Sequence, residues 1–371
     1  MTTQRAIPCS LYRGGTSKGL FFLEQDLPLD ERERNAVLLA AMGSPDERQI
    51  DGLGGAHPLT SKVAVVRKSE KPDVDVDYLF LQVALEKPEV STNQNCGNIL
   101  AGVGPFAIEQ GLVETSGDST DVRIHLDNTG AQAVARVQTP GNAVRYSGTT
   151  RIDGVPGAAA PVSIEFTDIE GSSCGALLPT GQAMENLEGV DVTCIDNGMP
   201  VVLMRAVDFG LSGYETPEQL ESDQALKSRL ENIRLKVGQR MNLGDVKAKT
   251  VPKMCLISPA KNGGLINTRT FIPHRVHEAI GVLGSVSVAT ACLIPDTLAY
   301  AMVRGSLSDA ESVREYAVEH PSGSFSVEMQ LKFSASGVVT VQRAALLRTA
   351  RLLMKGEVMI PEDNPVATKA N

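Results

Sequence analysis

Ser61-Lys62-Val63-Ala64-Val65-Val66 has a counterpart later in the chain, Pro252-Lys253-Met254-Cys255-Leu256-Ile257. In both stretches a lysine opens a short apolar run, which is the pattern of a buried β-strand. A hairpin-like segment and the glycine-flanked start of an apolar helix follow each run, at Cys96-Gly97-Asn98 and at Gly284-Ser285-Val286. The interval between lysine and helix is nearly equal in the two cases. The chain therefore contains two copies of one plan.

The order of elements around these stretches repeats as well. We expect strand, turn, strand and helix at 7–11, 13–19, 20–23 and 27–42, and again at 190–195, 196–200, 201–204 and 217–238. A repeating unit of about 180 residues is a duplicated domain, because solenoid repeats are shorter. We predict half-domains at 1–181 and 182–371, joined near 178–181, with the last strand or tail packing back on the first half.

Two predicted helices, Ile99–Ala107 and Ser285–Leu293, are small and apolar on every side. A helix of this kind is buried all round, so each should lie inside a sheet or barrel. The predicted fold class is therefore α/β (α+β), with two pseudo-symmetric domains that each wrap a barrel-like β-sheet around a central helix. The N-termini of the two helices would then face one cleft.

Composition and charge argue against several classes of function. The chain has 371 residues, 42% of them hydrophobic, and no run near the ~20 apolar residues that a membrane helix needs. Its N-terminus shows no signal-peptide pattern, so we expect a cytoplasmic protein without a membrane partner. The formal charge of -9 and the lack of a basic run argue against nucleic acid. The six cysteines show neither C-x-x-C nor zinc-ligand spacing, which favours reduced thiols.

The segment Asn93–Asn98, at the start of the first apolar helix, is the strongest local feature. Polar residues and a glycine ahead of an apolar helix leave its first backbone N–H groups free. Those donors and the helix dipole bind a carboxylate or enolate oxygen, and Cys96 is placed there to donate or accept a proton. The alternative is that Cys96 is an inert small residue near a helix cap.

Two further segments offer groups that suit an anion. Lys62 follows the glycine-rich run 52–61, and burial favours the neutral, basic form of an amine, although most lysines at strand ends are simply solvated. The segment Arg13–Gly19 lacks the spacing of a nucleotide-binding Walker loop. Its amides, hydroxyls and guanidinium can instead cradle a carboxylate, with a plain hairpin turn as the alternative.

The remaining candidates carry weaker signals. His274 and His277 lack a third ligand at suitable spacing, so we predict no metal site and favour capping or surface roles. His320 lies in a turn, where its ring either reaches the cleft or braces the loop. Arg269 and Arg348 either contact carboxylates or form surface ion pairs.

Several motifs together resemble the 2-methylaconitate cis-trans isomerase family, from about Ile7 to about Gly356. They are Arg13–Gly19, Ile50–Gly55, Leu59–Lys62, Asn95–Asn98, Asp153–Gly157, Asn197–Pro200, Arg240–Asp245 and His320–Gly323. The resemblance implies the diaminopimelate-epimerase fold, a site between the halves, and Lys62 and Cys96 as the catalytic pair. It also implies a substrate-binding set, namely Arg13, Thr16, Ser17, Asn95, Gly97, Asn98, Met199, Lys253, Arg269, Ser285 and His320. Epimerases of this fold use two cysteines, whereas the second half here offers Ser285, which favours a lysine-centred proton shift.

The implied reaction is a 1,3-allylic proton shift, with Lys62 as the base and Cys96 as the paired acid or a positioning group. Conjugation supplies the electron sink, so we expect no cofactor and no metal. The expected substrate is an unsaturated tricarboxylate, 4-oxalomesaconate from the degradation of lignin-derived aromatic acids such as gallate or protocatechuate. The first alternative is 2-methylaconitate of propionate catabolism. A cysteine hydrolase and a non-enzymatic carboxylate-binding protein are further alternatives, and the chain is a candidate homodimer.

Overall fold

The computed structural model describes residues 4–92, 96–167, 169–307, 312–334 and 339–362. The chain divides into two compact units. Unit 1 comprises Met1–Thr167 and Arg348–Asn371, and unit 2 comprises Asp168–Leu347. The segment 178–181, where the sequence suggests the join, lies within unit 2, and the C-terminal segment belongs to unit 1.

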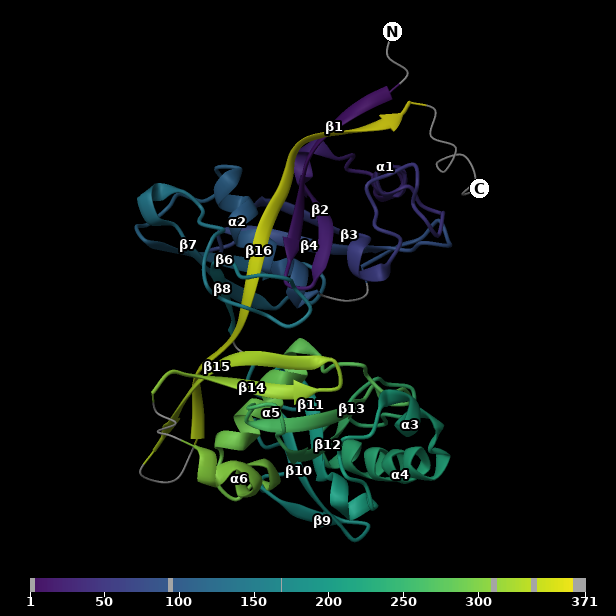
Figure 1. Cartoon of the computed structure of the whole chain (residues 1–371), viewed down its shortest axis with the longest axis vertical. Coiled ribbons are helices and arrows are strands. Elements are labelled where there is room, and N and C mark those ends of the chain that lie inside the picture. Colours follow the sequence, from purple (N-terminus) through teal and green to yellow (C-terminus); the bar gives the residue numbers. More distant parts are fainter. Residues whose placement is uncertain (1–3, 93–95, 168, 308–311, 335–338, 363–371) are drawn as a thin grey trace. The chain divides into compact units, whose positions relative to one another are not determined.

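Unit 1 is a ring of strands around a helix (Figure 1). Its strands are β1 (Gln4–Gly14), β2 (Ser17–Leu23), β3 (Lys62–Lys68), β4 (Val76–Val83), β5 (Val90–Ser91), β6 (Ser119–Leu126), β7 (Gln132–Gln138), β8 (Pro161–Thr167) and the later part of β16 (Val339–Pro361). Its helices are α1 (Glu31–Met42) and α2 (Gly97–Glu109). The pairs β2–β3 and β4–β6 are parallel. The pairs β1–β16, β1–β2, β3–β4, β4–β5, β6–β7 and β7–β8 are antiparallel. Each parallel pair is connected through a helix, α1 or α2, as parallel strands require.

Unit 2 repeats this plan. Its strands are β9 (Glu185–Leu187), β10 (Val190–Asp196), β11 (Pro200–Arg205), β12 (Lys253–Pro259), β13 (Ile266–Phe271), β14 (Arg314–His320), β15 (Gly323–Phe333) and the first part of β16. Its helices are α3 (Pro217–Ser222), α4 (Gln224–Arg240), α5 (Val282–Leu293) and α6 (Leu298–Val303). The parallel pairs β11–β12 and β13–β14 of unit 2 correspond to the pairs β2–β3 and β4–β6 of unit 1. The predicted mixed α/β fold, with two related units, is confirmed.

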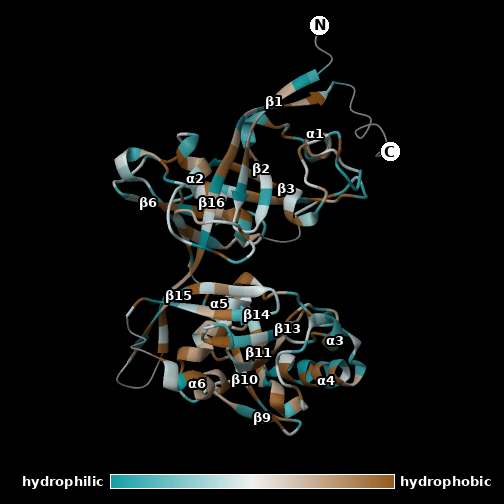
Figure 2. Cartoon of the chain, viewed as in Figure 1, coloured by the Kyte–Doolittle hydropathy of each residue, from teal (hydrophilic) through white to brown (hydrophobic). Residues whose placement is uncertain are grey.

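The central helices α2 and α5 are enclosed because their small residues let strands approach closely. α2 contacts β1, β2, β3, β6, β7 and β8, and a Cβ added at Gly102 would lie 2.7 Å from the Phe21 ring. At Gly104 an added Cβ would lie 2.9 Å from Val137, so neither glycine tolerates a side chain without a shift. Figure 2 shows apolar residues on α5 and a mixed surface on α4, which covers one side of its unit. Among the described residues no single helix is long and apolar enough to span a membrane, although α5 and the bent segment Leu298–Ser306 pass that test as a pair.

Two predicted helix boundaries are wrong for local reasons. The helix expected from Leu27 begins at Glu31, because the Asp30 side chain caps it by accepting hydrogen bonds from the N–H groups of Arg32 and Glu33. The helix expected over 217–238 is two helices. Asp223 ends α3 and caps α4, where its side chain accepts from the N–H of Leu226.

Candidate active site

The first turn of α2 carries Cys96 in an open position. Cys96 is the N-cap residue, with extended backbone (φ -129°, ψ 100°), and its thiol makes no capping hydrogen bond. Its side chain is partly accessible, whereas the other five cysteines are buried, and all six are free thiols. A helix start without a side-chain cap leaves its first N–H groups available to an anion. Asn95, the predicted neighbour, lies outside the described residues.

The β1–β2 turn packs directly on this helix start. A Cβ at Gly14 would lie 2.3 Å from the Asn98 carbonyl oxygen, and one at Gly15 would lie 2.1 Å from Asn98 Oδ1. Gly15 also has a φ of +51°, which favours glycine. The Asn98 amide donates to Thr16 Oγ1 at 3.1 Å. The glycines of the predicted cradle therefore let its backbone reach α2 and place Thr16 beside Gly97 and Asn98.

Lys62 enters the same neighbourhood from β3. It pairs with Gly19 of β2, where an added Cβ would lie 2.4 Å from the Lys62 carbonyl oxygen and 3.2 Å from Ile99 of α2. The lysine is 6% exposed. Its Nζ donates to Gln82 Oε1 at 2.7 Å and lies 5.1 Å from the centroid of the Phe80 ring. Within the described residues no carboxylate pairs with this amine, so its contacts are with neutral groups, an arrangement suited to proton exchange with a substrate.

Gln82 is a site residue that sequence reasoning missed. Its Nε2 donates to the carbonyl oxygens of Pro58 and Ser61 at 3.1 and 3.0 Å. These bonds turn Oε1 toward the Lys62 amine. The sequence indicated this role only through the alternation of side chains in β4, which places Gln82 on the same face as Tyr78 and Phe80.

The buried polar atoms of unit 1 that lack a hydrogen-bond partner among the described residues include Ser17 Oγ, Asn98 Oδ1 and Tyr78 Oη. Burial raises the pKa of Tyr78 well above its usual value, and the nearby Cys96 raises it further, so the hydroxyl keeps its proton. Buried polar groups without partners are rare and call for an explanation. A ligand with several oxygens at the start of α2 would accept hydrogen bonds from the Ser17 and Tyr78 hydroxyls, whereas Asn98 Oδ1 is an acceptor and needs a donor group on the ligand.

Arg13 lies on the other face of β1. Its Nη1 donates to the carbonyl oxygens of Gly15 and Thr349 and to Thr349 Oγ1, at 2.9 to 3.0 Å. The preceding residue, Tyr12, is buried and packs edge-on against Phe106 of α2. Successive side chains of a strand point to opposite faces, so Arg13 points away from α2. Burial lowers the pKa of Arg13, and neighbouring Arg351 lowers it further.

In unit 2, Lys253 opens β12 as Lys62 opens β3. Burial lowers the pKa of Lys253 to about 8, and Arg234 contributes to the shift. The pKa of His277 is also lowered, by burial and then by Lys253. Ser285 is fully buried in the first turn of α5, where its hydroxyl donates to the Val282 carbonyl oxygen at 2.7 Å.

The other predicted residues of unit 2 are held by local contacts. The Met199 carbonyl oxygen accepts a hydrogen bond from Ser287 Oγ at 2.7 Å. Arg269 donates to the Glu215 carbonyl oxygen at 2.7 Å and to Asn267 Oδ1 at 3.0 Å, and burial lowers its pKa. His320 packs on Phe325 with ring centroids 5.2 Å apart. The substrate-binding roles of these unit 2 residues stay predictions.

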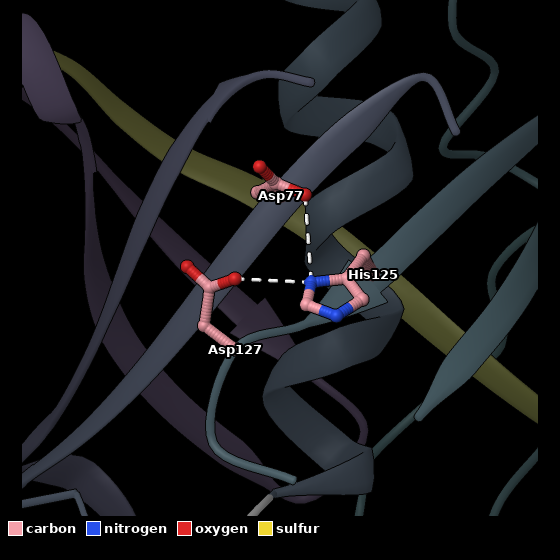
Figure 3. Close-up of side chains that lie close together, drawn as sticks. All are labelled: Asp77, His125 and Asp127. Atoms are coloured by element: carbon pink, nitrogen blue, oxygen red, sulfur yellow. Dashed lines mark hydrogen bonds and ion pairs between the residues drawn. The ribbon is translucent and has the colours of Figure 1, made fainter. Parts of the chain in front are cut away.

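One cluster has the composition of a metal site. Oxygens of Asp77 and Asp127 and a ring nitrogen of His125 lie within 4.8 Å of one another (Figure 3). Arg67 contacts both carboxylates, at 2.9 and 2.7 Å, and Lys71 donates to Asp77 at 2.8 Å. Burial raises the pKa of Asp77, but hydrogen bonds from Lys71 and Ser69 outweigh it and hold the pKa below its usual value. The two cations already neutralise the carboxylates, so we interpret the cluster as an ion-pair network.

Asn128 positions the segment that leads to Cys96. Its Oδ1 accepts the Phe80 N–H at 2.8 Å, and its Nδ2 donates to the carbonyl oxygens of Phe80 and Thr92 at 2.9 and 2.8 Å. One side chain therefore ties β4 to a residue shortly before Cys96. From sequence, Asn128 is an ordinary residue of the turn before Gly130.

Asn128→Asp should loosen this segment, because aspartate keeps the acceptor for Phe80 but loses both donated bonds. We expect iodoacetamide to alkylate Cys96 about threefold to tenfold faster, as the loss of about 1 kcal/mol implies. Mass spectrometry of the Cys96 peptide over time measures this rate, since the other cysteines are buried. The control is Asn186→Ala, which removes a polar side chain in unit 2. An unchanged rate in Asn128→Asp would show that the Thr92 bond does not hold the segment.

The fold and the site together define the class of the protein. One of two related α/β units holds a buried lysine amine on β3 and a free thiol at the uncapped start of its central helix. These are groups for proton transfer beside an anion site, and they indicate an isomerase.

Comparison with known proteins supports this class and identifies the family. The family model described as "PrpF protein" matches residues 4–361. The chain is 58% identical to 4-oxalomesaconate tautomerase of Pseudomonas putida, over 97% of this chain and 98% of the relative. It is 57% identical to (4E)-oxalomesaconate Delta-isomerase of Novosphingobium sp., over 95% of this chain and 97% of the relative. The crystal structure of a methylitaconate-delta-isomerase superposes with a TM-score of 0.86 at 34% identity, covering 98% of this chain and 97% of that one. The chain belongs to the PrpF protein family.

Proposed function

We propose that this isomerase converts 4-oxalomesaconate by moving a proton along its conjugated carbon chain. The observation that carries the proposal is the set of groups around α2. The buried Lys62 amine donates to the neutral Gln82 amide, and the Ser17 hydroxyl has no partner among the described residues. The two relatives named for oxalomesaconate, at 58% and 57% identity, support this substrate. The alternative, 2-methylaconitate, lacks the oxo group to which the Ser17 hydroxyl would donate.

The proposed reaction has two proton transfers. Lys62 removes a proton from a carbon conjugated through the C=C bond to a carbonyl group. The electron pair moves into the conjugated system, giving a dienolate, and the proton returns to a carbon two positions away. The N–H groups at the start of α2 stabilise the enolate oxygen, because they are oriented before the charge develops. In this proposal Cys96 returns the proton or orients the substrate.

The other expectations follow from this proposal. The substrate is a small polycarboxylate, so the site needs cationic and N–H groups rather than a large apolar surface. The six free cysteines fit a reducing compartment, which supports a cytoplasmic location. No oxidation or reduction occurs in the proposed steps, so they call for no redox cofactor.

Ultraviolet absorbance of the two candidate acids, followed with and without the protein, tests the assignment. We expect turnover of 4-oxalomesaconate with kcat/KM at least about tenfold above that for 2-methylaconitate, since a site that hydrogen-bonds an oxo group discriminates against its absence. Proton NMR of the products would identify the position of the double bond. Equal rates on the two acids, or turnover of 2-methylaconitate alone, would contradict the assignment.

A further inference from the structure

Unit 1 contains a cavity of about 290 Å³ that the proposed reaction does not use. Two arginines, Arg13 of β1 and Arg351 of β16, line it together with Thr349 and Tyr146. The segment 155–159 and Ile152 form a largely apolar wall. No aspartate or glutamate is among the lining residues. A cavity with two cations and no acid is chemically suited to an anion.

The two arginines are held close together by strand register. Arg13 and Arg351 are directly opposite in the antiparallel pair β1–β16, so their side chains lie on the same face. Like charges in directly opposite positions destabilise a strand pair. Burial lowers the pKa of Arg13, and neighbouring Arg351 lowers it further, in keeping with this repulsion. An anion between them would turn this repulsion into two attractions.

The guanidinium groups are also free to bind. All three hydrogen bonds of the Arg13 side chain use Nη1, so Nε and Nη2 have no partner within the described part of the chain. The Arg351 guanidinium has neither a hydrogen bond nor an ion pair there. The Thr349 bonds fix Arg13 in place before any ligand arrives, which reduces the entropy lost on binding.

We propose that Arg13 and Arg351 form a second anion-binding site that takes a small di- or tricarboxylate. Planar carboxylates match the guanidinium fork, and the apolar wall at 152–159 can contact a carbon skeleton, which inorganic phosphate lacks. The site is separate from Lys62 and Cys96, because Arg13 points to the face of β1 opposite Tyr12 and α2. It goes beyond the proposed reaction and does not depend on which acid is isomerised.

Calorimetric titration with tricarballylate, a saturated tricarboxylate that cannot be isomerised, tests the proposal in the full-length protein. We expect two binding sites in the unmodified protein and one in Arg351→Gln, with the lost site weakened at least about tenfold by removal of one bidentate partner. Lys355→Gln removes the same charge from the same strand outside the cavity lining and should keep both sites. A single site in the unmodified protein that Arg351→Gln leaves unchanged would overturn the proposal.

A second measurement separates this site from the catalytic one. Tricarballylate bound near α2 should slow alkylation of Cys96 by iodoacetamide, and Arg351→Gln should leave the concentration for half-protection unchanged. A parallel rise in that concentration would place Arg351 in the catalytic site and overturn the proposal. Inorganic phosphate should bind the unmodified protein at the cavity at least about tenfold more weakly than tricarballylate, since it lacks the carbon skeleton. Equal binding of phosphate would refute the carboxylate assignment.

Discussion

Lys62→Ala is expected to lower the rate of substrate isomerisation about 10³-fold, because a positioned general base contributes about 10²- to 10⁴-fold. Solvent-deuterium incorporation into substrate, followed by NMR, measures the proton-transfer step itself. The Lys62 amine is 6% exposed and held by Gln82 at 2.7 Å. No other lysine of unit 1 is buried among the described residues, so no other amine there has the same environment.

The comparison variant is Lys68→Ala, at the far end of the same strand. Lys68 is exposed and donates only to the Leu112 carbonyl oxygen, so its loss should leave the exchange rate within about twofold. Circular dichroism and thermal unfolding show that both variants remain folded. Exchange at the unmodified rate in Lys62→Ala would falsify the assignment of Lys62 as the base.

Cys96→Ser, measured in the same assay, distinguishes the two roles left open for the thiol. If Cys96 transfers the returning proton, its loss should cost about as much as the loss of Lys62. If it only orients the substrate, the serine variant should retain most of the exchange. In both cases the N–H groups at the start of α2 remain available to the substrate, because the Cys96 side chain does not cap them.

Arg234→Met is expected to destabilise unit 2 by about 3–5 kcal/mol, because a partly buried carboxylate and three carbonyl oxygens lose their donor. Arg234 is fully buried in α4 and forms two bonds with Glu231, at 2.6 and 2.8 Å. Its Nη1 also donates to the carbonyl oxygens of Val246, Lys249 and Val251, at 3.0 to 3.2 Å. Methionine fills similar space but leaves these acceptors without a donor, and each such loss is costly.

Thermal and urea unfolding measure this loss, which corresponds to a fall in Tm of about 10 °C for a unit of this size. Lys236→Met on the same helix is the matched control. Lys236 pairs with Glu188 at the surface, where both side chains are about half exposed, so its loss should cost at most about 1 kcal/mol. A fall in Arg234→Met no larger than in the control would show that the carbonyl oxygens find water instead.

Much of the fold could be predicted because each central element carries a local signal. The matching lysines at Lys62 and Lys253 and the apolar helices α2 and α5 show the duplication directly. The break between α3 and α4 was missed, because Asp223 fits an amphipathic helix as well as it fits a cap.

The site was predictable only where its residues belong to a short sequence motif. Thr16 and Asn98 each lie in such a motif, and the structure places them in contact. Gln82 and Asn128 lie in a strand and a turn with no motif of their own, and their roles arise from contacts across β4. The pairing of Arg13 with Arg351 joins opposite ends of the sequence, and such register cannot be derived from local patterns.

The long strand β16 has a consequence for the order in which the protein is made. Unit 2 is continuous in sequence, whereas the β1 edge from Gln4 to Gly14 pairs with Ala350–Pro361. On the ribosome, a nascent chain therefore carries an open β1 edge until residues 350–361 have been synthesised. Open edges invite pairing with other chains, so this interval is the period of greatest exposure to aggregation. Unit 1 emerges first but is the last to close.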